Sequence, residues 1–245
     1  MSQSDVSHSI PWFQASQRPL PGVQPLDLSD WIVVGDDFHD QMQLRDRLLT
    51  KRPGDVHALD KTGLLPAQEL LDTVLGHLWA FDTYTISAKS VTRPDGVLVG
   101  IDHRQPLVTL GRLCQEDFCI LTKSGPQHVL VGAVLCFPAS WQLREKIMRP
   151  LTDIHRPVPS YTADIAKRVQ RLFDGVQPDR PLWRANALWY DDPSLFQPRS
   201  ETAPRHRPGS APYLRSERQC ILRLPETRAV VFSIRTAVVH MGAQG

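Results

Sequence analysis

The spacing of apolar residues predicts two packing helices in the N-terminal half of the chain. Over residues 39–50, leucines recur one helical turn apart, and a broader apolar stripe follows Leu65 and ends at Trp79. Pro66 fits the first position of the second helix, because the N–H group that proline lacks would have no partner within the helix at that position. Both segments are expected to pack their apolar faces against a core.

Strand-like patterns dominate the middle and the end of the chain. Residues 117–123 and 128–137 are β-rich runs joined by Ser124-Gly125-Pro126, which predicts an antiparallel hairpin. The second run is apolar at both alternating sets of positions, so both of its faces are expected to be covered. A final hairpin is predicted to pair residues 219–224 with residues 229–239.

The remaining segments are shorter or richer in proline. We expect a short strand at 31–34, a short helix at 141–149, a proline-rich loop at 150–160, a helix at 161–174 capped by Ser160, and a loop or lid at 191–218. Residues 1–30 contain several prolines and no periodicity, which predicts an extended N-terminal arm. Two antiparallel hairpins with helices between them predict an α+β fold, with one antiparallel sheet and helices on one of its faces.

Composition and charge narrow the class of protein. Of the 245 residues, 41% are hydrophobic, as in an ordinary globular protein, and no apolar run approaches the ~18 residues of a membrane-spanning helix. The 28 Lys and Arg nearly balance the 26 Asp and Glu, so neither nucleic acid nor a membrane is an expected partner. The first residues lack the basic and apolar regions of a secretory signal. The four cysteines show no Cys-x-x-Cys spacing, and we expect a reduced, cytoplasmic protein.

Polar clusters interrupt the apolar elements at four places: Gln115-Glu116-Asp117, the segment IHRPVPSY at 154–161, Trp183-Arg184-Ala185-Asn186, and RSERQ at 215–219. Each has an ordinary structural interpretation, as the solvated start of a strand, a hydrogen-bonded loop histidine, a plain turn or surface ion pairs. The alternative is a functional site. The prolines around His155 restrict the backbone, and a side chain held in one direction suits a metal ligand.

The order of these clusters carries a family resemblance. QEDF at 115–118, FPASW at 137–141, IHRPVPSY, WRAN and RSERQ are followed by RLPETRAVVFSIRT at 223–236. This pattern resembles the haem-dependent oxidative N-demethylase family, which includes the haem subunits of dimethylamine monooxygenases. The resemblance covers roughly residues 30–240. Two positions depart from the family pattern: Ala187 and Ala237 stand where aromatic residues are usual.

The resemblance implies a fold and a reaction. It implies a single PAS-like haem-binding domain at 31–245, an antiparallel sheet flanked by helices that carries haem b with its iron. It also implies that O2 and reducing equivalents remove a methyl group from a small secondary amine such as dimethylamine, releasing formaldehyde. The electrons would come from NADPH through FMN and an iron–sulfur centre of a partner reductase. The alternative is a haem-binding PAS-type sensor or an inactive relative.

The resemblance and the needs of haem chemistry together nominate site residues. His155 is the expected iron ligand, and Cys114 and Cys119 are thiolate alternatives. A secondary ammonium ion brought beside haem needs a carboxylate, for which Glu116 and Glu217 are candidates together with Asp117. Tyr161 is expected to bond the amine or bound oxygen. The cations expected to pair the haem propionates are Arg218, Arg184 and Lys146.

Overall fold

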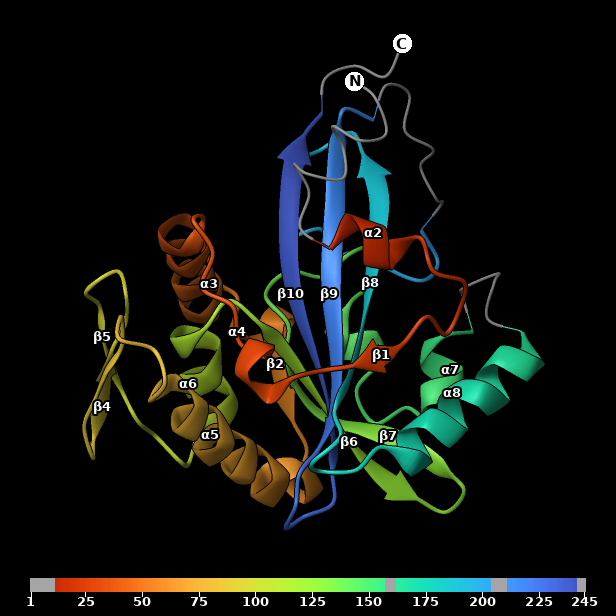
Figure 1. Ribbon diagram of the computed structural model, residues 1–245, viewed down its shortest axis with the longest axis horizontal. Coiled ribbons are helices and arrows are strands. Elements are labelled where there is room, and N and C mark those ends of the chain that lie inside the picture. The colour runs from red at the N-terminus through yellow and green to blue at the C-terminus, as the bar shows by residue number, and fades with distance from the viewer. Residues whose placement is uncertain (1–11, 157–161, 204–210, 242–245) are drawn as a thin grey trace.

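The protein is described by a computed structural model in which residues 12–156, 162–203 and 211–241 are placed (Figure 1). The helical segments are α2 (Phe13–Ser16), η1 (Leu28–Asp30), α3 (Phe38–Lys51), α4 (Pro53–Val56), η2 (Lys61–Gly63), α5 (Leu64–Leu78), α6 (Pro106–Leu113), η3 (Leu143–Glu145), α7 (Leu151–Ile154) and α8 (Ala163–Gly175). The strands are β1 (Gln24–Pro25), β2 (His57–Leu59), β3 (Thr85–Ile86), β4 (Ser90–Thr92), β5 (Leu98–Gly100), β6 (Asp117–Ser124), β7 (Gln127–Val134), β8 (Leu182–Tyr190), β9 (Tyr213–Arg223) and β10 (Val230–His240).

One large antiparallel sheet organises the fold. Its seven strands run in the order β1-β8-β9-β10-β6-β7-β2, and β3, β4 and β5 form a separate small sheet. The expected α+β class, an antiparallel sheet with flanking helices, is therefore confirmed. Both predicted hairpins are present: β6 pairs with β7, and β9 pairs with β10 along eleven residue pairs. The last of the described strands, β10, lies in the interior of the sheet between β9 and β6.

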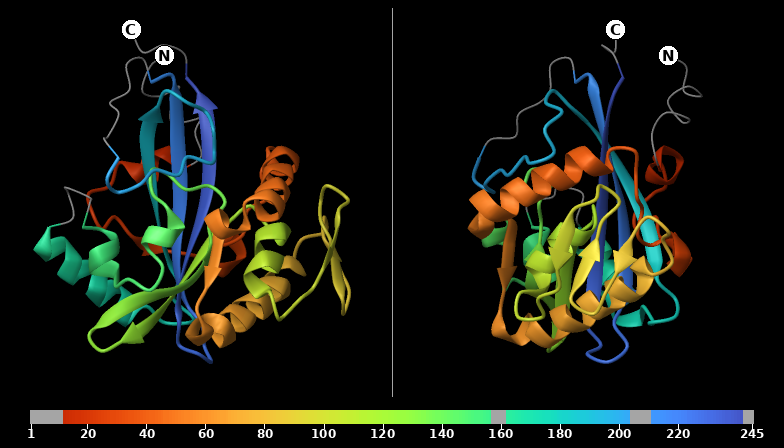
Figure 2. Two further views of the ribbon diagram at one scale, coloured as in Figure 1. Left: turned by 180° about the vertical axis from the view of Figure 1, so that it is seen from behind. Right: turned by 90° about the vertical axis from the view of Figure 1, so that its left-hand side faces the viewer.

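Helices cover both faces of this sheet, whereas helices on one face only were expected. The helices α3, α5 and α6 lie on one side of it, and α7 and α8 lie on the other (Figures 1 and 2). Alternate residues of β6 show the same division. Phe118 and Ile120 belong to the core under the first group of helices, while Cys119 and Leu121 belong to the core under the second. The apolar pattern of residues 128–137 is explained by this double cover.

The N-terminal arm lies against the body of the protein in its described part. β1 pairs with the start of β8, at Gln24 with Trp183, and the Leu26 N–H donates to the Pro181 carbonyl at 2.9 Å. Trp31 and Ile32 are buried, but residues 31–34 do not form the predicted strand. The N–H of Val33 donates to a side chain, the Glu116 carboxylate, at 3.0 Å, so this backbone is satisfied without a strand partner.

Several other boundaries differ from the sequence prediction. α3 matches the expected helix, and α5 begins at Leu64, so that Pro66 is its third residue. The expected helix at 141–149 is only the short η3, because Met148 has a φ of 60° and Pro150 disfavours helix in the residue before it. α8 is capped by Thr162, whose side chain accepts from the Ile165 N–H. Ser160 lies outside the described residues.

The C-terminal half contains two strands where loops were predicted. The polar segment at 183–186 is part of β8, and β9 begins at Tyr213, so residues 213–218 of the predicted loop are strand. The charged residues of RSERQ suggest a solvated loop. In the structure they belong to a strand, and each of their arginine and glutamate side chains is buried and hydrogen-bonded within the protein. A strand whose polar residues find internal partners has no alternation of apolar and polar positions to reveal it.

Candidate functional site

A mostly apolar cavity of about 560 Å³ lies between the sheet and α7–α8, a size typical of cofactor pockets. Its walls come from four parts of the chain: the N-terminal arm, the strands β6 and β7, the segment from Trp141 to α8, and the strands β8, β9 and β10. Residues that line it include Arg18, Pro21, Cys119, Leu130, Trp141, Leu151, Ile154, His155, Ile165, Val169, Phe173, Arg184, Asn186, Ala187, Gln219, Ile221 and Phe232.

His155 lies in the wall of this cavity, at the C-terminal end of α7. Its Nδ1 lies 2.9 Å from the Leu151 carbonyl oxygen. A carbonyl only accepts, so Nδ1 carries the proton, and the lone pair of the neutral ring is on Nε2. Burial, assisted by the nearby charges of Lys146 and Arg184, lowers the pKa of His155. The ring is thus held in the neutral form and in the tautomer that a metal ligand requires.

Arg184 is the cation of β8 that lines the same cavity. Its Nε is buried and has no hydrogen-bond partner, and burial lowers its pKa, with only partial compensation by Glu217. A partly buried guanidinium whose charge is only partly compensated is costly, and a carboxylate placed in the cavity would relieve that cost. Arg18, which is exposed on the N-terminal arm, also lines the cavity.

Polar side chains on the sheet face complete the site. Asn186 on β8 lies directly opposite Glu217 on β9, and Gln219 lies two residues further along β9. Asn186 and Gln219 line the cavity, while Glu217 is 7% exposed and accepts hydrogen bonds from both of them. The carboxylate therefore acts on the cavity through two amide side chains.

The described residues contain no group of three or more His, Cys, Asp or Glu side chains placed to hold a metal ion. A metal bound at His155 would need most of its ligands from elsewhere, as a porphyrin supplies them.

Comparison with known protein families gives a match to a haem-dependent family, which agrees with a cavity of cofactor size. Residues 22–243 match the family described as haem-dependent oxidative N-demethylase, alpha subunit-like. The chain belongs to this family. The match spans the arm from Gly22 onward and all the strands of the large sheet, while the lining residues Arg18 and Pro21 lie just before it.

Besides Glu217, Asp117 and Cys114, three residues expected in the N-demethylase site lie outside the cavity lining. Lys146 is buried, and its Nζ donates to the Ile154 carbonyl at 2.7 Å and pairs with Glu201. Arg218 points away from Gln219, since neighbouring strand residues face opposite ways; it donates to the Asp30 carbonyl and lies over the Trp183 ring. The third is Glu116, which lies on the opposite side of the sheet from the cavity, the side covered by α3, α5 and α6.

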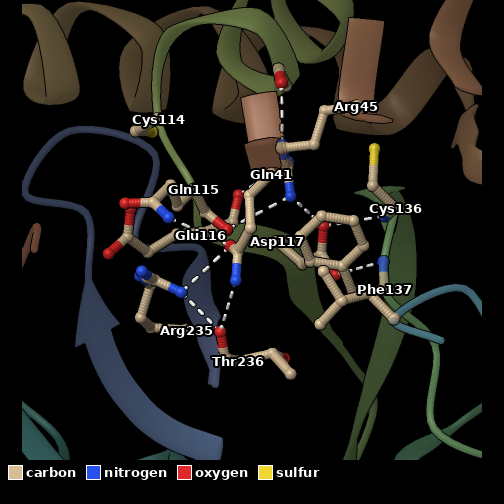
Figure 3. A network of polar contacts seen from close by, with 12 residues as sticks. Gln41, Arg45, Cys114, Gln115, Glu116, Asp117, Cys136, Phe137, Arg235 and Thr236 are labelled. Carbon is tan, nitrogen blue, oxygen red and sulfur yellow. Dashed lines mark hydrogen bonds and ion pairs between the residues drawn. The ribbon is translucent and has the colours of Figure 1, made fainter. Parts of the chain in front are cut away.

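The QEDF segment forms a buried polar network that joins α3 to the sheet (Figure 3). Arg45 of α3 is fully buried and pairs with Asp117 at 2.7 Å. Asp117 also accepts from the N–H groups of Cys136 and Phe137, which draws the chain away from the β ladder after Val134. Arg45 and Asp117 compensate each other's charge, and both carboxylate oxygens of Asp117 are bonded, as an internal structural anchor requires.

Glu116 is the imperfectly satisfied member of this network. Its Oε1 accepts from the Val33 N–H, while its Oε2 is buried without a hydrogen-bond partner. Burial raises the pKa of Glu116, and Arg235 and the Val33 N–H oppose the shift only in part. The folded state therefore favours the protonated carboxyl. This contribution to stability is fully present below the unfolded pKa of about 4.3 and is lost as the pH rises through the folded pKa.

We accordingly expect Glu116→Gln to stabilise the protein at neutral pH, by roughly 1 kcal/mol. The amide imitates the protonated carboxyl and can still accept from Val33. Urea unfolding at pH 5 and pH 8 measures the effect, with a larger gain at pH 8. Glu226→Gln, at an exposed position, is the matched control and should show no such difference. Equal stability of Glu116→Gln and the parent chain at both pH values would contradict this assignment.

The other predicted site residues are placed as follows. Tyr161 and the prolines of the IHRPVPSY segment lie outside the described residues. Cys119 lines the cavity, and burial raises the pKa of its thiol to about 12, which opposes a thiolate ligand. Cys114 is buried outside the cavity lining. Ala187 lines the cavity, and Ala237 is buried on β10 opposite Ser216.

Sequence reasoning missed the roles of Asn186, Gln219 and the N-terminal arm. Both amides stand inside the quoted WRAN and RSERQ motifs, at positions that alternate with Arg218 and Ala185 along their strands. Recognising β8 and β9 as strands would have placed them on one face with Glu217. No pattern in the arm signals that it lines the cavity. Among the described helices, none is long and apolar enough to cross a bilayer.

Proposed function

We propose that this chain is the haem-binding component of an oxidative N-demethylase that removes a methyl group from a small secondary amine. O2 and electrons from a partner reductase would drive the reaction, with formaldehyde as a product. The family match supports haem-dependent N-demethylase chemistry. The observation that carries the proposal is His155: a neutral imidazole, fixed by a carbonyl, in the wall of a cofactor-sized cavity.

The residues present fit haem b. His155 would ligate the iron, and Arg184, whose buried Nε has no partner, would receive a propionate carboxylate. Apolar side chains such as Trp141, Leu130 and Phe173 would contact the macrocycle. When bound, haem supplies the iron that activates O2. The PAS-like interpretation belongs to this proposal, and the central strands β7-β6-β10-β9-β8, with α7 and α8 between β7 and β8, support it.

The chain's own residues would prepare the cavity for an amine. The apolar walls exclude water from the methyl groups, and the Asn186–Glu217–Gln219 group provides polar contacts on the sheet face. None of the described residues that line the cavity carries a carboxylate, so a bound ammonium ion would meet the charge of Glu217 only through the two amides. Flavin, NADPH and iron–sulfur chemistry are assigned to a separate reductase in a reduced, cytoplasmic setting.

Absorption spectroscopy of the purified chain tests this function. Titration with haemin is expected to give a saturable Soret band with a stoichiometry of one haem per chain, and dimethylamine is expected to shift that band. A Soret band that no secondary amine perturbs would favour the alternative of a non-catalytic haem-binding sensor. Failure to take up haem at all would refute the proposal.

A further inference from the structure

Two side-chain amides in the cavity wall are oriented by one carboxylate. The Asn186 Nδ2 donates to the Glu217 Oε2 at 3.4 Å, and the Gln219 Nε2 donates to the same oxygen at 3.1 Å. A carboxylate accepts only, so both NH₂ groups must face Glu217. The amide carbonyl oxygens, Asn186 Oδ1 and Gln219 Oε1, are thereby turned away from the carboxylate.

Neither carbonyl oxygen has a protein partner among the described residues. The hydrogen bonds of Asn186 and Gln219 are those to Glu217, and the side chains themselves line the cavity. Two strands paired in register fix them: Asn186 lies opposite Glu217, and Gln219 lies opposite Arg184. The wall therefore presents two adjacent, oriented hydrogen-bond acceptors to whatever occupies the cavity.

The charged side chains around the two amides nearly cancel one another in the proposed holoprotein. Arg215 Nε donates to the Glu217 Oε1 at 3.1 Å and balances the carboxylate. Arg184, the other cation on this face, would be balanced by a propionate in the function proposed above. The number of hydrogen-bond donors on a ligand, more than its charge, would then decide how well it binds.

We propose that Asn186 and Gln219 are the specificity-determining pair that recognises a dialkylammonium ion, with each amide oxygen accepting one N–H of the nitrogen. Glu217 is a positioning residue that holds both amides in this orientation. An alkylamine is protonated at neutral pH, so a secondary amine brings two N–H donors, a tertiary amine one and a quaternary ammonium none. The inference rests on the proposed function for its substrate class.

Isothermal titration calorimetry with three probes of similar chemistry tests the pairing. Dimethylammonium, trimethylammonium and tetramethylammonium chlorides are titrated at neutral pH into the full chain, with and without added haemin. Dimethylammonium is expected to bind most tightly, and tetramethylammonium about a hundredfold more weakly, because it loses two hydrogen bonds and each one lost costs about tenfold in affinity.

Variants assign the discrimination to the two amides. Asn186→Leu and Gln219→Met approximate the shapes without a carbonyl; each is expected to weaken dimethylammonium binding about tenfold and to leave tetramethylammonium binding unchanged. Glu217→Gln is expected to lower the ratio of the two affinities while the Soret band persists, which a merely structural role would not produce. Gln177→Met, at an exposed glutamine outside the cavity, is the matched control.

The outcomes separate this inference from the proposed function. Haem uptake without discrimination among the three ions overturns the inference and leaves haem binding standing. Discrimination that persists in both Asn186→Leu and Gln219→Met also overturns it. If the chain takes up no haem, but binds dimethylammonium selectively through these amides, the acceptor pair is supported and the haem function falls.

Discussion

Replacing His155 by alanine is expected to remove tight haem binding, with an affinity loss of at least about a hundredfold. Loss of an outer partner of a metal ligand already costs about 10–100-fold, and loss of the ligand itself should cost more. The remaining cavity is mostly apolar, and Cys119, the thiol that lines it, has a pKa raised to about 12 by burial. Haemin titration followed at the Soret band measures the loss, and added imidazole should partly restore the band.

His57→Ala is the matched control for this experiment. His57 is also a half-buried histidine whose pKa is lowered by burial, but it stands on β2 outside the cavity lining. Its replacement should leave the Soret band unchanged. An unaltered spectrum in His155→Ala would place the iron ligand elsewhere, and the combination with Cys119→Ser would then show whether the thiol holds it.

Asp117→Ala should destabilise the protein by about 3–5 kcal/mol, the usual cost of leaving one charge of a buried pair without its partner. The substitution would leave the fully buried guanidinium of Arg45 without its carboxylate partner, and the N–H groups of Cys136 and Phe137 without an acceptor. Urea unfolding followed by circular dichroism measures the loss. The effect needs no haem, so it can be measured on the protein before any cofactor is added.

The surface ion pair between Asp164 and Arg168 provides the comparison. Both side chains are more than half exposed, and Asp164→Ala should cost less than about 0.5 kcal/mol. Adding Arg45→Met to Asp117→Ala should recover part of the loss but not all of it, because two backbone donors remain unpaired. A loss below about 1 kcal/mol for Asp117→Ala would show that water reaches the network.

Local pattern was sufficient for the elements whose stabilising contacts are also local in sequence. α3, α5, α8 and the β6–β7 hairpin follow from periodicity and turn residues, and the structure contains all of them. The family assignment also followed from ordered motifs. His155, which the IHRPVPSY motif suggested as the iron ligand, lies in the cavity wall. Its assignment as the ligand stays a prediction.

The errors arose where side chains distant in sequence satisfy the backbone. Residues 31–34 look like a strand, but Glu116, 83 positions away from Val33, takes up the N–H that a neighbouring strand would bind. Likewise the N–H groups of Cys136 and Phe137, just beyond the end of β7, donate to Asp117, 19 and 20 positions earlier in the sequence. No local pattern contains such partners.

Only part of the candidate site was predicted, because the sequence does not show which face of the sheet a residue lies on. Arg184 and His155 come from separate motifs and share one cavity, as expected, whereas Glu116 lies on the opposite side of the sheet. Sequence order placed the QEDF cluster beside a buried strand but could not say which face of the sheet it serves. Successive residues of a strand face opposite ways, so one position decides between a cavity and a structural core.

The position of β10 has a consequence for how the protein is made. Among the described strands of the large sheet, β10 is synthesised after the others and is inserted between β6 and β9, and Phe232 on it lines the cavity. Until then β6 has an open edge, which invites aggregation of the nascent chain. A cofactor can therefore enter its finished pocket only after β10 has been synthesised, and a nonsense mutation before codon 230 would remove a strand from the middle of the sheet and from the cavity wall.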